Sequence, residues 1–302
     1  MKVLHYEHMG VGVVLSKALR KLGVHSRVLS SAPHPFGFKE DYLFSQNRYM
    51  RKFLRRLEWR RYYGFNILHS HDNNCLPQYV LKRWRGALIQ HYHDPHTKKP
   101  LYDNVPSFVS LPNILKAVPD ATWIPIPVDT NFFRPKKTCK RKKVCIGFYD
   151  QKTEPNKLKF IPKTETKKAT KKLGNKVLMA PLNKIIPYRL IRSYYNQIDI
   201  WVDRIGCDFY GFTAVEAAAM NIPIITQIGE DEQTWVPNCP FVNTSRDGVA
   251  DAIISLAEDE QLRKSLGEKG RQYVSEIHDS LKVAQTCLEQ YEKLTIKGEL
   301  QQ

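Results

Sequence analysis

The apolar residues near the N-terminus follow first the spacing of a strand and then that of a helix. Residues 2–5 read as a short strand, and a turn with Gly10 and Gly12 comes next. From Val11 the apolar residues fall at positions 11, 14, 15, 18, 19 and 22, which is the period of an amphipathic helix. Gly23 stands where a helix C-cap belongs, and residues 25–30 read as a second strand. A strand, a helix and a strand in this order favour a parallel sheet.

Strand-like and helix-like segments go on alternating to the end of the chain. In the first half we expect strands at 65–69 and 87–93, a helix at 76–84, and short apolar runs around Phe108 and at 123–126. In the second half we expect strands at 144–149, 177–180, 198–202 and 222–226, and helices at 188–196 and 213–220. Beyond Asp247 the chain reads as helical, and its last apolar residues, from 281 to 294, make a strong amphipathic helix. The pattern predicts an α/β protein with two doubly wound domains.

A change of composition divides the two halves. Positions 136–143 follow Pro135 and carry six positive charges. We interpret them as a solvated linker, with a polyanion-binding patch as the alternative. The predicted domains are therefore 1–135 and 136–280, followed by a C-terminal helix at 281–302. A chain of 302 residues has room for two domains of roughly 130 to 150 residues each.

Composition indicates the cellular compartment of the protein and the charge of its ligands. No apolar run approaches the roughly 20 residues of a membrane-spanning helix, and Glu7 follows the first apolar positions too soon for a secretory signal. The six cysteines are scattered without a Cys-x-x-Cys pair, which favours a reducing, cytoplasmic location. The 47 Lys and Arg residues against 30 Asp and Glu give a formal charge of +17. Such a charge attracts polyanions, so nucleic acid, anionic lipid and a diphosphate ligand all stay open.

Residues 198–226 carry the most informative chemistry. They read as a buried strand, a glycine-containing loop, an alanine-rich helix and a second strand. A loop that leads into a helix at the carboxyl edge of a parallel sheet offers unpaired N–H groups and the positive end of the helix dipole, which together bind anions. In a purely structural alternative, Thr213 and Glu216 form a capping box, with the carboxylate bonded back to the start of its own helix.

This segment resembles the retaining GT-B glycosyltransferases of family 4. Their motif places an acidic residue, seven others and then Glu in a Gly-Phe loop that leads to Glu-Ala-x-Ala-x-Gly-x-Pro. Here Asp208 and Glu216 hold the two acidic positions, and Pro223 holds that of the proline. Two departures are the shorter Asp208 in place of Glu and Asn221 in place of Gly; Asn tolerates the left-handed backbone that this position needs. The segment resembles nearly as well those relatives that read Asp-x-x-x-x-Gly-x-Tyr-Gly without the first acid.

The resemblance extends over most of the chain and implies both a fold and a reaction. Residues 126–135 look like the segment that closes the family's first domain, and 262–271 with the helix around Tyr291 look like its last helices, which cross back to that domain. The implied fold is GT-B, with two Rossmann-like domains facing a cleft. The implied reaction moves a sugar from a nucleotide-sugar donor to a hydroxyl acceptor, which is a glycan, lipid-linked or protein-linked, with retention. No cofactor or metal is implied, and the sequence has no Asp-x-Asp to hold a divalent ion.

The same resemblance implies a set of site residues. Glu216 would bind the nucleotide ribose, and Asp208 would contact the donor sugar. His93, at the end of the predicted strand 87–93, would orient donor and acceptor, with a hydrogen-bonded loop histidine as the alternative. Lys157, with Lys152 as its partner, would bind the donor phosphates, although surface lysines are more often simply solvated. The loop residues expected around the diphosphate are Gly12 in the first domain and Tyr210, Gly211, Phe212 and Thr213 in the second.

Three histidines, at positions 91, 93 and 96, raise the question of a zinc site. Their strand-then-loop spacing and the lack of a nearby cysteine argue against one. We therefore expect no metal.

Two other classes of protein share the expected ligand. A non-hydrolysing sugar-nucleotide epimerase has the GT-B shape but needs acid/base carboxylates around the sugar, and few lie in these segments. A donor-binding protein that has lost catalysis is favoured by the shortened acid at position 208 and by the absence of an arginine beside Lys157.

Residues 48–63 predict an amphipathic basic helix. Its apolar side holds Met50, Phe53, Leu54 and Leu57. One interpretation packs that side on the core and leaves the basic side in solvent, and the other lays the helix on an anionic membrane, on the inner face. Nucleic acid is disfavoured, because no binding module is recognisable. The candidates for membrane contact are Arg51, Lys52, Arg55, Arg56 and Trp59.

Overall fold

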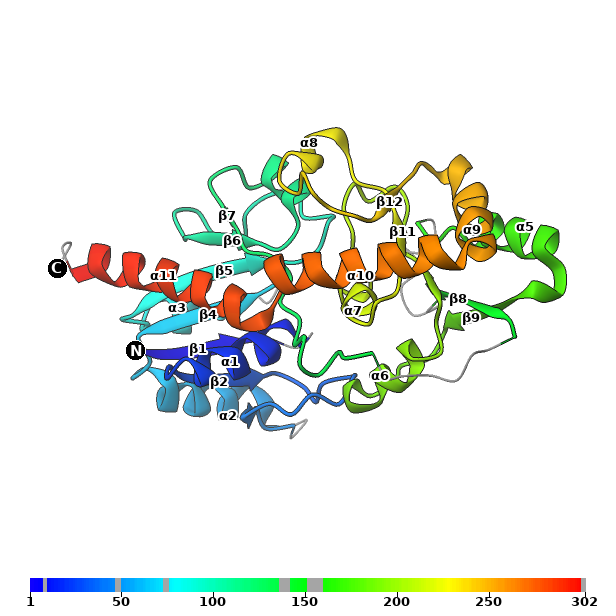
Figure 1. The fold of residues 1–302 in the computed structure, drawn as a ribbon. Coiled ribbons are helices and arrows are strands. Elements are labelled where there is room, and N and C mark those ends of the chain that lie inside the picture. The colour runs from blue at the N-terminus through cyan, green and yellow to red at the C-terminus, as the bar shows by residue number, and fades with distance from the viewer. Residues whose placement is uncertain (8–9, 47–49, 73–75, 136–141, 151–159, 300–302) are drawn as a thin grey trace. The chain divides into compact units, whose positions relative to one another are not determined.

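The computed structural model describes residues 1–7, 10–46, 50–72, 76–135, 142–150 and 160–299. By its internal contacts the chain divides into two compact units, which we call unit 1 (Met1–Pro127 with Ser280–Gln302) and unit 2 (Val128–Asp279). Each unit is built around one parallel sheet with helices packed on it (Figure 1). Positions 136–141 of the expected linker lie outside the described residues.

Unit 1 contains a seven-stranded sheet in the order β3-β2-β1-β4-β5-β6-β7, and every neighbouring pair is parallel. The chain builds β2 and β3 on one side of β1 and then returns to place β4 on the other side. This reversal between β1 and β4 is the feature that positions ligands in doubly wound folds. The strands are β1 (Lys2–Tyr6), β2 (His25–Ser30), β3 (Tyr42–Leu43), β4 (Ile67–His71), β5 (Ala87–Tyr92), β6 (Ser107–Val109) and β7 (Thr122–Trp123).

Helices cover both faces of this sheet because successive strand residues point to opposite sides. On one face Val3, Ile67 and Ile89 pack against the helices α1 (Val11–Lys21) and α11 (Ser280–Glu299). On the other face Leu4 and Leu68 belong to a second cluster of buried apolar side chains. That cluster contains residues of the 3-10 helix η1 (Trp59–Tyr62) and of α3 (Gln78–Leu81), and the helix α2 (Arg51–Glu58) directly precedes η1 in the chain. A further 3-10 helix, η2 (Pro112–Lys116), follows β6.

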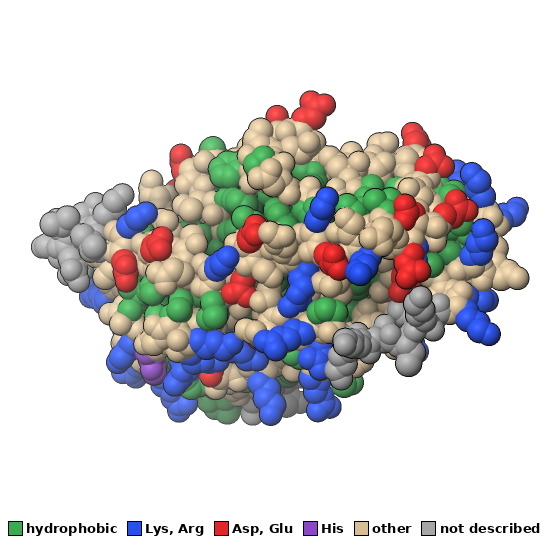
Figure 2. Space-filling view, viewed as in Figure 1, with side chains coloured by type: hydrophobic (Ala, Val, Ile, Leu, Met, Phe, Trp, Pro, Cys, Tyr) green, Lys and Arg blue, Asp and Glu red, His purple; other side chains and the backbone are tan. Residues whose placement is uncertain are grey.

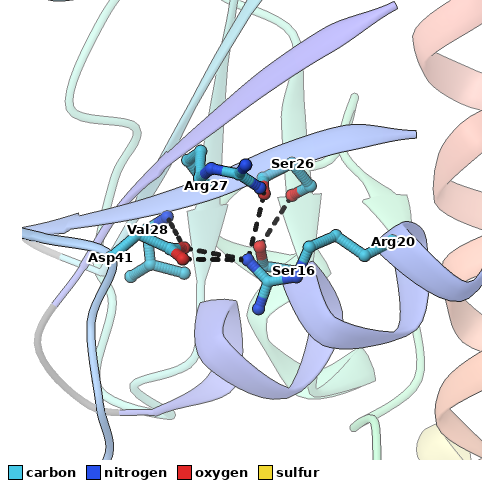
Figure 3. Close-up of polar contacts among 6 residues, drawn as sticks. All are labelled: Ser16, Arg20, Ser26, Arg27, Val28 and Asp41. Atoms are coloured by element: carbon cyan, nitrogen blue, oxygen red, sulfur yellow. Dashed lines mark hydrogen bonds and ion pairs between the residues drawn. The ribbon is translucent and has the colours of Figure 1, made fainter. Parts of the chain in front are cut away.

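Polar contacts at the edge of unit 1 fasten α1 to β2 (Figure 3). The Arg20 guanidinium donates to the Asp41 carboxylate over 2.9 Å and to the Ser26 carbonyl over 3.1 Å. The same carboxylate accepts the Val28 N–H over 2.8 Å, and the Ser26 hydroxyl donates to Ser16 over 2.8 Å. Both charged side chains are nearly a third exposed, so the ion pair itself contributes at most about 1 kcal/mol. The buried hydroxyl pair and the backbone contacts determine the position of the helix.

Unit 2 contains a five-stranded parallel sheet in the order β12-β11-β10-β8-β9. Its order reverses between β8 and β10, because β9 lies on one side of β8 and all later strands lie on the other. The strands are β8 (Val144–Tyr149), β9 (Val177–Leu182), β10 (Ile200–Val202), β11 (Ile224–Thr226) and β12 (Val242–Asn243).

The helices of unit 2 bury apolar stripes against this sheet, with Ile146, Val202 and Ile225 at the centre of the core. The start of the unit is held to its end: the Val128 N–H donates to the His278 carbonyl over 2.8 Å, and Arg271 donates to the Phe133 carbonyl over 2.8 Å. The helices are α5 (Lys163–Leu173), α6 (Tyr188–Tyr195), α7 (Phe212–Ala219), α8 (Glu230–Gln233), α9 (Val249–Glu258) and α10 (Glu260–Ile277), with the 3-10 helices η3 (Gly174–Lys176) and η4 (Arg246–Gly248).

Most expected elements lie within a few residues of those observed, and the strands expected at 25–30 and 144–149 coincide with β2 and β8. The helix expected at 76–84 was too long. It spans only Gln78–Leu81, because Pro77 precedes it and Trp84 already turns to donate to the Ala87 carbonyl over 3.2 Å. Helix α5 was not predicted, because most of its residues are charged or polar. Its buried residues are Thr166, Ala169 and Leu173, which is too few for a clear apolar period. Among the described helices, none has the combined length and apolar character that a bilayer crossing requires.

Candidate functional site

The loop between β10 and α7 lies where the strand order of unit 2 reverses. Ligands of doubly wound sheets bind beyond the carboxyl ends of the strands at such a point. Here β8 is followed by Asp150 and β10 by Asp203. Lys163, at the start of α5, donates a hydrogen bond to Asp150 and forms an ion pair with it, with Nζ and Oδ2 2.6 Å apart. Topology therefore points to the same loop as the sequence motif, by an independent argument.

Asp203 anchors this loop from inside the protein. Its carboxylate is buried, and its Oδ2 accepts the Gly211 N–H over 2.8 Å. Burial raises the pKa of Asp203, while the Arg204 charge and backbone hydrogen bonds oppose that rise. The Gly211 amide, which we expected at the diphosphate, is thus already bound within the protein. At the start of α7, which begins at Phe212, the Ala214 N–H donates to the Gly211 carbonyl over 3.1 Å, and the helix dipole places a partial positive charge at this end.

Arg204 lies directly over the loop and was missed by the sequence analysis. A Cβ built on Gly211 would lie 2.7 Å from its Nη2 atom, so the guanidinium packs closely against the backbone of the loop. The guanidinium offers five donors in a planar fork that matches phosphate oxygens. The signal was available in the sequence, since Arg204 follows the predicted strand 198–202 within two residues.

The backbone at Asp208 has the left-handed conformation, with φ of 55°. Its side chain is exposed, and its carbonyl accepts the Gly229 N–H over 2.9 Å. Asp and Asn tolerate this conformation better than most residues. In the pattern Asp-x-x-x-x-Gly-x-Tyr-Gly, Asp203 takes the first position and Asp208 the first glycine position, so the structure fits this second pattern well. Asn221, just after α7, has φ of 61°, which confirms the left-handed backbone expected there.

The side chain of Tyr210 points into the core of unit 2. Its hydroxyl is 2.8 Å from the Tyr273 hydroxyl and 2.9 Å from His278 Nε2. Burial, together with the neighbouring Tyr273 and Cys239, holds the pKa of Tyr210 well above its usual range. The Tyr210 side chain therefore fastens the loop to α10. Only the backbone of Tyr210 is left to contact a diphosphate.

Glu216 makes its hydrogen bond to a neighbouring helix. Its Oε2 accepts the Tyr195 hydroxyl of α6 over 2.8 Å, and the side chain is half-buried. Desolvation raises the pKa of Glu216 to about 7, against the smaller opposing effect of the tyrosine. The capping-box interpretation was wrong: the N-cap is Gly211, no side chain caps the helix, and Thr213 lies inside its first turn. A carboxyl group whose pKa is raised by desolvation in this way is typical of a ligand site.

In unit 1, Gly12 and His93 lie close to the carboxyl ends of β1, β4 and β5. Gly12 is the second residue of α1, and a Cβ built on it would lie 2.9 Å from Glu7 Cγ and 3.0 Å from His71 Nε2. His93 Nδ1 is 2.8 Å from the Ser110 hydroxyl, and burial lowers the pKa of His93 to about 3. The imidazole is therefore neutral at physiological pH. His93 directly follows β5, the strand next to β4 in the sheet, and the role expected of it stays a prediction.

Five buried histidines meet at this edge, and only two of them, His91 and His93, are close together in the sequence-based prediction. His5 pairs with His69 across β1 and β4, and His71 with His91 across β4 and β5. His93 follows on the same side of β5, whereas His96 lies in the loop beyond and is outside the group. The alternation His-x-His at 69–71 and 91–93 was the signal, since two residues apart in a strand share one face.

The expected membrane face on α2 needs correction. Trp59 is buried, with its ring centroid 5.5 Å from those of Tyr6 and Phe44, so its assignment to a membrane contact was wrong. Arg55 donates to the Ser31 carbonyl over 2.8 Å, and Arg56 lies over the Tyr79 ring. The side chains of Arg51 and Lys52, and all of Lys152 and Lys157, are outside the described part of the chain.

The apolar side of α2 is exposed instead of packed on the core. Met50, Phe53 and Leu57 are 49%, 59% and 43% exposed. Lys and Arg side chains gather along the lower edge of the view in Figure 2, where Figure 1 places α2 and β2, with apolar side chains between them. The interpretation as a core-packed helix with a solvated basic face was therefore wrong for these three side chains.

Solved structures with the same architecture match nearly the whole chain. Sucrose-phosphate synthase from Thermosynechococcus elongatus has 14% sequence identity and a TM-score of 0.69, with 97% of this chain and 99% of that one covered. A glycosyltransferase from Rickettsia africae has 15% identity and a TM-score of 0.65, over 97% and 98% of the two chains. HepE from Anabaena, solved in complex with UDP-glucose, has 13% identity and a TM-score of 0.63, over 97% and 100%. No protein-family model matches the sequence, and no curated protein does.

Two parallel-sheet domains of this kind, together with these likenesses, define the GT-B fold. The chain thus has two Rossmann-like units, as the resemblance implied.

Proposed function

We propose that this protein is a glycosyltransferase, which moves a sugar from a nucleotide-sugar donor to a hydroxyl acceptor. One observation carries the proposal: at the strand-order reversal of unit 2, a buried carboxylate holds the loop that leads into α7, and Arg204 lies over that loop. This arrangement suits a diphosphate at the start of the helix. The UDP-glucose bound to HepE, which has the same fold, supports a nucleotide sugar as the ligand class.

The chemistry of the leaving group supports the same assignment. Transfer of the sugar leaves negative charge on the nucleoside diphosphate, and groups already aimed at that charge lower the barrier. Arg204 and the N-terminus of α7 are such groups, and Lys163 lies beside the end of β8. In our proposal Lys152 and Lys157 add to them, and the backbone of 210–213 lines the phosphates.

The remaining groups position the donor and the acceptor. We assign the ribose hydroxyls to Glu216, which hydrogen-bonds in either protonation state, and the sugar to Asp208, whose side chain is exposed at the loop. The neutral imidazole of His93, and the helix start at Gly12, belong to the acceptor-side domain. The resemblance of 208–223 supports retention and a transfer without metal at the donor phosphates. The acceptor class is a glycan, a lipid-linked or a protein-linked hydroxyl.

Binding and turnover separate this proposal from its two alternatives. Thermal unfolding against UDP-, GDP-, ADP- and dTDP-sugars identifies the nucleotide, because a ligand of the folded state adds about 2.7 kcal/mol at a hundred times Kd. NMR of the chosen donor then reports its fate. Release of the nucleoside diphosphate with a sugar of unchanged anomeric configuration supports the transferase. Inversion at the sugar C2 with the donor intact supports an epimerase, and binding without turnover supports a protein that only holds the donor.

The acceptor side includes a surface suited to a membrane. The exposed Met50, Phe53 and Leu57 recur at helical spacing, and Arg56, Arg60 and Arg61 are exposed beside them. An anionic surface attracts each such cation by about 1 kcal/mol, and the apolar side chains enter the interface. We therefore assign α2 to peripheral contact with the inner face of an anionic membrane, where a lipid-linked acceptor would lie, in a cytoplasmic enzyme.

Sedimentation with lipid vesicles tests this assignment. We expect binding to vesicles with phosphatidylserine, weak binding to phosphatidylcholine alone, and loss of binding at high salt. The double variant Phe53→Asp, Leu57→Asp should remove it. The matched control, Leu178→Asp with Leu190→Asp, changes two side chains that are each 50% exposed on unit 2. Equal loss in both pairs, or equal binding to both lipids, contradicts the assignment.

A further inference from the structure

Five buried imidazoles in unit 1 form one hydrogen-bonded series. His5 Nδ1 is 3.0 Å from His71 Nε2, and His71 Nδ1 is 3.0 Å from His93 Nε2. From His93 Nδ1 the series passes through the Ser110 hydroxyl, at 2.8 Å, to His91 Nε2, at 3.1 Å. It continues from His91 Nδ1 to His69 Nε2 over 3.1 Å and ends at the Tyr291 hydroxyl of α11 over 2.6 Å.

These rings are held in the form that binds metals. The five histidines are at most 8% exposed. Burial lowers the pKa of every one of them, to about 3 for His5 and for His93 and well below the usual range for the other three. A neutral imidazole presents one lone pair and one N–H, and the lone pair is the metal ligand.

Two overlapping triads bring ligand atoms within 4.8 Å of one another: His5 with His69 and His71, and His71 with His91 and His93. The second is the better candidate because its members reach the surface through His93, which is 8% exposed, whereas His5 and His69 are fully buried. A tetrahedral ion with metal–nitrogen bonds of about 2.0–2.1 Å holds two nitrogens roughly 3.3 Å apart. The present 3.0 Å between His71 Nδ1 and His93 Nε2 needs only a small opening.

The outer hydrogen bonds of this triad also match those of a metal centre. Ligating histidines almost always donate their second N–H to an acceptor, which determines the tautomer and the ring orientation. If Nδ1 of His71 binds the ion, its Nε2–H faces His5 Nδ1; if Nε2 of His93 binds, its Nδ1–H faces Ser110. His91 has an acceptor on either side, in Ser110 or in His69.

We propose that His71, His91 and His93 bind one divalent first-row transition-metal ion of the Zn²⁺ type. His5, His69 and Ser110 are the positioning residues around it. Imidazole ligands suit Zn²⁺, Co²⁺ and Ni²⁺, and three of them leave a fourth position for water or for a ligand oxygen. The sequence-based expectation of no metal considered positions 91, 93 and 96, whereas the site uses 71, 91 and 93. His93 then meets a substrate only through the open position of the ion. The site does not depend on the proposed glycosyl transfer.

The experiment uses tag-free protein, because a polyhistidine tag would bind the same ions. Zn²⁺ is added, the excess is removed by gel filtration, and the metal is counted by mass spectrometry. We expect about one ion per chain. Co²⁺ in place of Zn²⁺ should give the visible d–d absorption of a four-coordinate nitrogen site, without thiolate charge-transfer bands. This measurement on the unchanged protein holds even if a variant fails to fold.

Variants then locate the ion. His93→Gln should lose it, and His25→Gln, which alters an exposed histidine on β2, should keep it. His5→Gln separates the two triads and should keep the ion with weakened affinity, because it removes only an outer hydrogen bond. Circular dichroism and unfolding curves verify the fold of each variant. The proposal is overturned by Zn²⁺-treated protein that retains no ion and shows no Co²⁺ spectrum. It is equally overturned by full retention in folded His93→Gln, or by loss in His5→Gln alone.

Discussion

Glu216→Gln should make the protein more stable at neutral and alkaline pH, although it removes a residue of the proposed donor site. In the folded chain the pKa of Glu216 is raised from its ordinary 4.5 to about 7, chiefly by desolvation. Between these two values the folded state holds the proton and the unfolded state does not. Stability contributed by this group is therefore lost as the pH rises from about 4.5 to about 7. At about 1.4 kcal/mol per pH unit, the full loss is about 3 kcal/mol.

Glutamine keeps the shape and the acceptor for the Tyr195 hydroxyl but carries no charge. The assay is urea unfolding of both proteins at several values from pH 5 to pH 8.5. We expect the difference between variant and wild type to be small at pH 5 and to grow to at most about 3 kcal/mol in favour of the variant above pH 7. Glu268→Gln, on the exposed side of α10, is the control and should show no such growth. Parallel stability curves for wild type and Glu216→Gln would refute the raised pKa.

Three further substitutions test the packing on which the sites depend. Tyr210→Phe removes two buried hydrogen bonds and should cost about 1–3 kcal/mol in urea unfolding, and no change would show that the hydroxyl does not fasten the loop. Gly12→Ala should cost about 1–3 kcal/mol because its Cβ meets Glu7 and His71 at 3.0 Å or less, whereas Gly64→Ala has nothing within 4 Å and should be nearly neutral by the same assay. Trp59→Ala should cost about 3–5 kcal/mol in thermal unfolding against less than about 1 kcal/mol for Phe53→Ala, and similar costs would contradict the burial of Trp59.

The elements were predictable where their local pattern is strong. Helix α1 has apolar residues at positions 11, 14, 15, 18 and 19, with Gly10 before it and Gly23 shortly after it, and β2 and β8 are short apolar runs between turns. Helix α2 shows the limit of such patterns. Its amphipathic period was correct, but a period does not tell which side meets the core, and here the sheet face is filled by Trp59 of the next turn.

Of the two candidate sites, one could be recognised from the sequence and the other could not. The loop 203–216 is continuous in sequence, so its motif could be recognised, although the anchoring by Asp203 and the position of Arg204 needed coordinates. The histidine group joins positions 5, 69–71 and 91–93 through strand order and register. The local His-x-His pattern shows only that the two histidines of each strand share a face, and it does not show which strands are neighbours. Only the order β1-β4-β5 brings these side chains together.

Binding of the donor to the β10–α7 loop is the most direct test of the account. Isothermal titration with the nucleotide sugar selected by thermal unfolding should give one site per chain in the wild type. Arg204→Met and Glu216→Gln should each weaken binding at least tenfold. Their matched controls, Arg189→Met on the exposed side of α6 and Glu268→Gln on α10, should bind as the wild type does. Unchanged affinity in folded Arg204→Met and Glu216→Gln, or no binding of any nucleotide sugar by the wild type, would contradict the central claim.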